Sequence, residues 1–140
     1  NAYIYYKQAF EHPIDPAQPW LPILAQAYLR SMNSTGRAEE AIAFFTPLYD
    51  SFSGDASFLC TLGVSYLRTN QPMKAMMEFV RALQCSDASS EGVTTYIPYY
   101  NIGLINEMLG DINSAVSFYQ RAAAYGYPLA VERLNELGIT

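Results

Sequence analysis

One residue pattern occurs twice in the chain, 40 positions apart, and it limits the possible folds more than any other feature. The copies span residues 59–82 and 99–122, so the chain has a repeat unit of about 34 residues with an insertion near residues 89–94. The matching positions are Leu59, Leu62, Gly63, Tyr66, Ala75, Phe79 and Ala82 in the first copy, and Tyr99, Ile102, Gly103, Asn106, Ala115, Tyr119 and Ala122 in the second.

A weaker copy precedes these two. It comprises Leu21, Leu24, Ala25, Tyr28, Ala41, Phe45 and Leu48, and its internal gap is four residues longer, which predicts a longer turn over residues 31–37. Pro47 falls within its second half, where it predicts a kink or an early helix end, because proline cannot donate the helical hydrogen bond. Residues 2–9 hold only the second half of a further copy.

Each copy predicts two antiparallel helices joined by a short turn. Apolar residues recur three and four positions apart, as on one face of a helix. Gly110 suits a left-handed helix end and Asp111 suits the following N-cap, while Asn70 and Pro72 suit the same two places in the earlier copy. Residues 128–137 predict one more helix with a polar outer side. The fold class is therefore all-α.

Two glycines lie inside predicted helices, at Gly63 and Gly103. Glycine in mid-helix costs roughly 0.5–1 kcal/mol relative to alanine, so close packing must offset it. We expect both glycines to lie where the two helices of a pair cross, facing the small residues Ala75 and Ala115.

The pattern resembles the signature of the tetratricopeptide repeat family, W-x2-L-G-x2-Y…A-x3-F…P, although leucine or tyrosine replaces the tryptophan in every copy. The resemblance implies a right-handed superhelix that forms one domain over residues 1–140. It would consist of a second helix of a partial repeat (1–15), three repeats (18–54, 56–88 and 96–127) and a capping helix (128–137).

Composition excludes several classes of partner. The net charge is −5 and only 15% of residues are charged, which disfavours nucleic acid and anionic membrane surfaces. No apolar run approaches 18 residues. Cys60 and Cys85 are interpreted as reduced thiols of a cytoplasmic protein. The absence of an initiator methionine predicts an excised or processed segment.

The sequence predicts no catalytic residue, no cofactor and no metal. His12 is the only histidine, and it lies in a predicted turn, so neither a Cys/His zinc site nor a Cys–His nucleophile follows from its position. Motifs for nucleotide or metal binding are missing. Asn33-Ser34-Thr35 matches an N-glycosylation acceptor and is interpreted as a chance match.

The family resemblance implies a concave groove lined by one face of each first helix, which suits a peptide held by apolar anchors and a few polar contacts. A Lys/Asn/Arg clamp for a terminal carboxylate is not supported, because Val64 and Leu104 stand at its positions. An alternative is that the chain itself or a second copy fills the groove. The residues predicted to line it are Gln26, Leu29, Arg30, Cys60, Val64, Leu67, Arg68, Ile97, Tyr100, Leu104, Glu107 and Met108.

Three functions follow. The preferred one is a non-catalytic protein–protein interaction module. The second is an accessory domain of a larger bacterial enzyme, because the run Gly126-Tyr127-Pro128-Leu129-Ala130-x-x-Arg133-Leu134 is similar to segments that follow family 2 glycosyltransferase domains. The third is a structural solenoid that self-associates through an uncapped N-terminal edge, since residues 2–9 begin inside a repeat.

Overall fold

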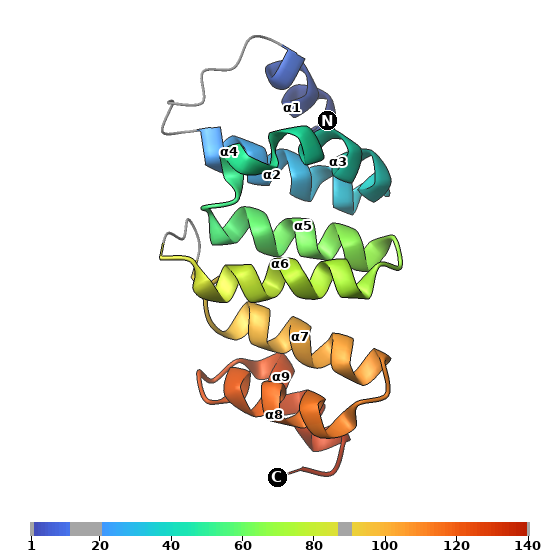
Figure 1. Cartoon of the computed structure of the whole chain (residues 1–140), viewed down its shortest axis with the longest axis vertical. Coiled ribbons are helices and arrows are strands. Elements are labelled where there is room, and N and C mark those ends of the chain that lie inside the picture. Colours follow the sequence, from blue (N-terminus) through green and yellow to red (C-terminus); the bar gives the residue numbers. More distant parts are fainter. Residues whose placement is uncertain (1, 12–20, 87–90, 140) are drawn as a thin grey trace.

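A computed structural model describes residues 2–11, 21–86 and 91–139 of the chain, and within these ranges all regular structure is helical. The helices stack one after another along a single long axis (Figure 1). In chain order they are α1 (Ala2–Glu11), α2 (Leu21–Ser34), α3 (Ala38–Phe45), the 3-10 helix η1 (Thr46–Leu48), α4 (Tyr49–Phe52), α5 (Ala56–Arg68), α6 (Pro72–Gln84), α7 (Tyr96–Met108), α8 (Ile112–Ala123) and α9 (Pro128–Glu136).

Consecutive helices form pairs, and the pairs pack on one another as in a helical repeat. α5 packs on α6 and α7 on α8, while α2 contacts α5, and α6 contacts α7. The turns use the predicted chemistry. Asn70 has φ +59° and Gly110 has φ +85°, both left-handed. Asp111 accepts a hydrogen bond of 3.1 Å from the backbone N–H of Ser114, and Pro72 begins α6.

The predicted early helix end at Pro47 is confirmed. α3 ends at Phe45, and Pro47 lies in the 3-10 turn that leads to the short helix α4. Thr46 stabilises this helix end, because its hydroxyl donates a hydrogen bond of 2.6 Å to the carbonyl of Ile42. The break places Phe52 of α4 in the core, where its ring centroid lies 5.4 Å from that of Phe58.

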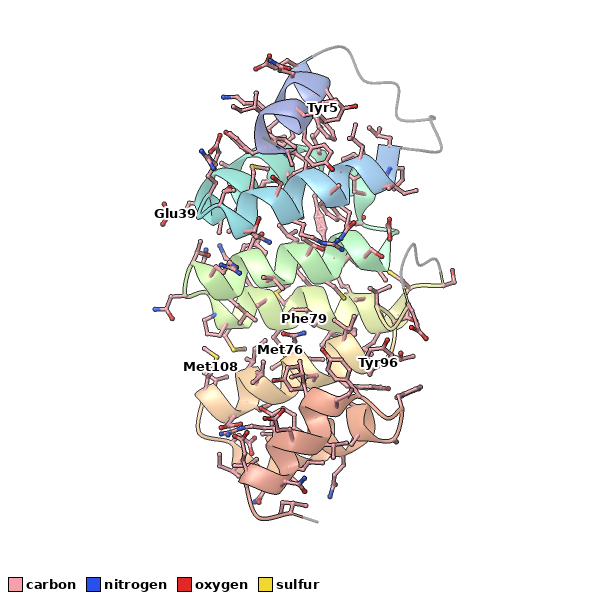
Figure 2. All side chains as sticks on the ribbon, turned by 180° about the vertical axis from the view of Figure 1, so that it is seen from behind. Tyr5, Glu39, Met76, Phe79, Tyr96 and Met108 are labelled. Carbon is pink, nitrogen blue, oxygen red and sulfur yellow. The ribbon has the colours of Figure 1, made fainter. Side chains whose placement is uncertain are left out.

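The glycines do mark close helix packing, but the side chains nearest to them are aromatic rings and not the predicted alanines. A Cβ atom built on Gly63 would lie 2.7 Å from the ring of Phe79, and one on Gly103 would lie 2.6 Å from the ring of Tyr119 (Phe79 is labelled in Figure 2). Each glycine therefore makes room for an aromatic ring of the second helix rather than for an alanine. The carbonyl oxygen of Ala115, one of the two predicted facing residues, lies 3.3 Å from the Cβ position of Gly103.

Aromatic rings fill the core of the first part of the stack. The ring of Phe10 stacks on Tyr28 with centroids 5.3 Å apart, and Phe45 meets Phe58 edge-on at 5.5 Å. These contacts join α1, α2, α3 and α5 into one core. A smaller cluster at the other end joins Ala115 and Tyr119 of α8 to Leu134 of α9.

Of the predicted features, one lies outside the described residues and another lies only partly within them. His12 lies outside them. The predicted insertion is described from residue 91 onward, where Val93 is buried and Gly92 has φ +81°. The backbone N–H of Ile97 donates 3.0 Å to the carbonyl of Gly92, so this turn leads directly into α7.

Candidate functional site

An open pocket of about 270 Å³ lies where α2, α5 and the start of α7 meet. Six of the twelve residues predicted for the groove line it: Gln26, Arg30, Cys60, Val64, Arg68 and Ile97. The pocket also has residues that the sequence patterns did not single out for it: Asn33, Ser34, Ser57, Thr61 and Val93. Its volume is near the low end for small-ligand sites and suits a few side chains.

A buried hydrogen-bond network holds the two main walls together. The amide of Asn33 donates 3.1 Å to the carbonyl of Thr61 on α5, and the hydroxyl of Ser65 donates 2.6 Å to the Asn33 side-chain oxygen. Asn33 is only 4% exposed, so its amide serves this interface and is shielded from modification. A satisfied polar network of this kind fixes the position of one helix on the other.

The turn before α7 completes an apolar wall. Cys60 is buried, and its thiol donates a hydrogen bond of 3.4 Å to the carbonyl of Val93. Burial raises the pKa of the Cys60 thiol to about 12, so this residue is an uncharged apolar surface at neutral pH. Cys60 and Cys85 are both free thiols. Val64, Val93 and Ile97 extend the same wall.

The charged residues of the pocket are both arginines. Arg30 comes from α2 and Arg68 from the last turn of α5, and no acidic residue lines this pocket. Within the described ranges neither arginine forms an ion pair, whereas Arg37 and Arg133 do. With the Gln26 amide turned so that its oxygen faces Arg30, one turn further along the same helix, that oxygen accepts a hydrogen bond of 3.2 Å from Arg30 Nε. The pocket is therefore a local positive site on an acidic chain.

Ser57 carries an unused hydrogen-bonding group at this site. Its side chain is 1% exposed, and its hydroxyl has no partner among the residues that the structure describes. Buried hydroxyls are normally hydrogen-bonded, and each exception needs a physical reason. Because Ser57 lines the pocket, its hydroxyl can accept or donate a hydrogen bond to a bound group.

The other six predicted groove residues do not line this pocket. Leu29 is buried in the core, and Leu67 packs against it. Tyr100 and Leu104 pack against the cluster of α8 and α9, and the ring of Tyr100 meets that of Tyr127 with centroids 5.4 Å apart. Met108 is 59% exposed at the end of α7 (Figure 2). The closing helix and the turn before it therefore partly cover Tyr100 and Leu104 and leave Met108 exposed. Filling of the groove by the chain itself was the alternative considered for the groove as a whole.

Glu107, which was predicted to line the groove, is partly buried and is paired within the fold. Its Oε1 atom accepts hydrogen bonds of 2.8 Å from the Tyr119 hydroxyl and 2.9 Å from Arg133 Nε, and its other oxygen pairs with the same guanidinium. The hydrogen bonds from Arg133 lower the pKa of the Glu107 carboxyl. The signal was present in the sequence, because Tyr119 and Glu107 replace Phe79 and Leu67 at the same two positions, 40 residues on.

A comparison with protein families finds a match in the part of the chain that contains α7 and α8. Residues 98–125, which cover most of α7 and all of α8, match the family model of the tetratricopeptide repeat. The chain contains a tetratricopeptide repeat. No curated protein sequence matches the chain.

Tetratricopeptide repeats are generally non-catalytic modules for protein interaction. The helices that precede the matched repeat also pack as pairs on neighbouring pairs, as in a helical repeat. Across residues 2–11, 21–86 and 91–139, no group of three or more His, Cys, Asp or Glu side chains is arranged to hold a metal ion. The same stretches contain no helix with the length and apolar character to cross a membrane.

A second hollow, of about 520 Å³, adjoins the pocket and shares Asn33 and Arg68 with it. It lies two helix pairs away from the matched tetratricopeptide repeat, at the turn between α2 and α3. Unlike the pocket, it has charges of both signs, since Arg37, Glu39 and Glu40 line it. Arg68 thus stands at the junction of an apolar pocket and a polar hollow.

Proposed function

We propose that the chain is a non-catalytic interaction module that binds a peptide segment of a partner protein in the pocket between α2, α5 and α7. Solenoids of stacked helix pairs present extended surfaces that suit such segments. The pocket has a volume of about 270 Å³, which has room for a few side chains of a peptide. It is open to the surface, so these side chains can enter it.

One observation carries this proposal. Residues far apart in the sequence, Gln26 and Arg30 on α2, Val64 and Arg68 on α5, and Ile97 on α7, line one open pocket. Apolar side chains form one wall and arginines supply the charge. Apolar anchors with a few oriented polar contacts are what peptide recognition in a groove requires.

A peptide display selection tests the proposal. A random peptide library is selected on the wild-type chain, and the enriched peptides are then measured against Val64→Arg, which fills and charges the pocket wall. Val80→Arg is the matched control, because Val80 is 39% exposed on α6 and does not line the pocket. Circular dichroism and thermal melting confirm that both variants fold.

We expect the enriched peptides to lose at least tenfold in affinity for Val64→Arg and to bind Val80→Arg as they bind the wild type. If they bind Val64→Arg unchanged, the pocket is not the binding surface. If no peptide is enriched on the wild type over an unrelated helical protein, the module does not recognise peptides.

A further inference from the structure

The pocket has an apolar end and a basic end, a fixed distance apart. Cys60, Val93 and Ile97 surround the apolar end, and Arg68 marks the basic end. Cys60 and Arg68 lie on the same helix, eight residues apart, which corresponds to roughly 12 Å at the helical rise. This distance constrains the residues that one bound peptide can present to both ends.

An extended peptide advances roughly 3.3 Å per residue, so roughly four residues span the distance from Cys60 to Arg68. Side chains alternate between the two faces of an extended chain, and residues four positions apart point to the same side. A spacing of four therefore meets both requirements, whereas spacings of three or five direct one of the two side chains away from the pocket.

The basic end calls for a carboxylate. Arg30 and Arg68 have no ion-pair partner among the described residues, and the pocket contains no acidic side chain of its own. Arginine presents a planar fork of donors that matches a carboxylate. The unpartnered, buried hydroxyl of Ser57 is an independent indication that this pocket receives a polar group of a ligand, in this case a peptide backbone group.

The second hollow indicates that the carboxylate belongs to a side chain and not to the C-terminus of the peptide. It also indicates that the peptide has one acidic residue and not several. The hollow continues past Arg68, so the bound chain has room to run on rather than end there. Beyond Arg68, the hollow has two carboxylates, Glu39 and Glu40, and one arginine, Arg37, so its net charge there is negative and it would repel further acidic residues of the ligand. A run of acidic residues is therefore a poorer ligand than one acidic residue.

Building on the proposed function, we infer that the pocket recognises an extended peptide with an apolar residue and a single Asp or Glu four positions apart. The apolar side chain lies on the wall formed by Cys60, Val93 and Ile97. The carboxylate lies on Arg68.

Fluorescence anisotropy with defined peptides tests the inference. The probe is a fluorescein-labelled peptide with a leucine and a glutamate four positions apart, serine and alanine between them, glycine flanks and an amidated C-terminus. We expect at least tenfold weaker binding when glutamine replaces the glutamate, when the glutamate moves by one position, and when three further glutamates follow the first.

A charge reversal assigns the contact to Arg68. Arg68→Glu should lose the glutamate probe and gain at least tenfold in affinity for the same peptide with lysine in place of glutamate. Arg121→Glu is the matched control, because Arg121 is an exposed arginine in the last turn of α8, away from the pocket. It should bind both peptides as the wild type does.

The outcomes separate this inference from the proposed function. If the glutamine peptide binds as well as the glutamate probe, or if only peptides with a free terminal carboxylate bind, the inference is overturned. The same holds if the glutamate probe does not bind at all. Peptides enriched by display that lose affinity for Val64→Arg would still support the proposed function in each of these cases.

Discussion

The Tyr119 hydroxyl of α8 donates a hydrogen bond of 2.8 Å to the Glu107 carboxylate of α7, while the Tyr119 ring packs on Gly103. Arg133 of α9 binds the same carboxylate, so three helices meet at one acidic group. In the preceding helix pair Phe79 packs on Gly63 in the same way but has no hydroxyl, and the position of Glu107 is taken by Leu67. The polar group of the later pair thus joins α9 to the stack.

Replacing Arg133 should therefore loosen α9. We expect Arg133→Met to lower the free energy of unfolding, because a charge-assisted hydrogen bond to a partly buried carboxylate is lost. Urea denaturation followed by circular dichroism measures the change. Arg121→Met should change it by less than about 0.5 kcal/mol. Equal effects of the two variants would contradict this role of Arg133.

The same carboxylate makes stability depend on acid. The pKa of Glu107 is lowered in the folded chain, so its contribution is present above the pKa of an unfolded glutamate and is lost as the pH falls below about 4.3. We expect Glu107→Gln to be less stable than the wild type at pH 7 and to lose less stability on acidification. Denaturation midpoints from pH 7 to pH 3 measure this, and parallel pH profiles would contradict it.

Gly103 should not tolerate even one added methyl group. A Cβ at this position would lie 2.6 Å from the Tyr119 ring, which is itself buried. We expect Gly103→Ala to destabilise the chain despite the higher helix propensity of alanine, and Gly103→Leu to cost about 1–3 kcal/mol or more. Gly54→Ala is the control, since no atom lies within 4 Å of its Cβ position. If Gly103→Ala melts at the temperature of the wild type, the packing argument is wrong.

Glu78 is a buried carboxyl group that should weaken the fold at neutral pH. It accepts a hydrogen bond of 3.0 Å from the Tyr49 hydroxyl, but its other oxygen has no partner among the described residues. Burial raises the pKa of Glu78, so its stability contribution is full below the unfolded pKa and is lost as the pH rises through the folded value. Glu78→Gln should therefore gain stability over the wild type as the pH rises from 4 to 7.

Thermal melting at several pH values checks this prediction. Glu132→Gln serves as the control, because Glu132 is exposed on α9. A stability difference between Glu78→Gln and the wild type that stays constant over this pH range would show that Glu78 does not titrate differently on folding.

Two buried serines on α5 should respond in opposite ways to alanine. Ser65 donates a hydrogen bond of 2.6 Å to Asn33, so Ser65→Ala should lower the free energy of unfolding by about 1 kcal/mol. Ser57 has a buried hydroxyl without a described partner, so Ser57→Ala should leave stability unchanged or raise it. Chemical denaturation compares the two. A loss for Ser57→Ala as large as that for Ser65→Ala would mean that its hydroxyl is already satisfied.

The turns and the helix break were predictable because each depends on local residue chemistry. Gly110 and Asn70 adopt left-handed φ angles, and Pro47 ends α3, whatever packs around them. Whether a polar helix residue faces the groove or a partner elsewhere in the fold was less predictable. Glu107 has the spacing of a groove residue, but its partner Arg133 lies 26 positions further along the chain. The replacement of Phe79 by Tyr119, 40 positions on, indicates a polar partner for Tyr119 but does not indicate Arg133.

The lining of the pocket was likewise only partly predictable from the sequence. The spacing of Val64 and Arg68 follows from one helix, whereas Val93 comes from an insertion that the repeat pattern cannot place. Ser57 was not predicted, because a serine in the first turn of a helix is ordinary and its lack of a partner appears only in three dimensions. The packing of Tyr100 and Leu104 against the cluster of α8 and α9 was not predictable from their spacing for the same reason.

The cover that α9 forms over α7 also bears on how such a chain can change in evolution. Because Tyr100, Leu104 and Glu107 are committed to α9, substitutions there alter the integrity of the closing unit rather than the choice of ligand. Residues on α2 and α5 are free of that constraint. Duplication of a helix pair ahead of α7 would lengthen the binding surface and leave the closing unit intact, so new specificities should arise in the first half of the chain while the last half stays recognisable.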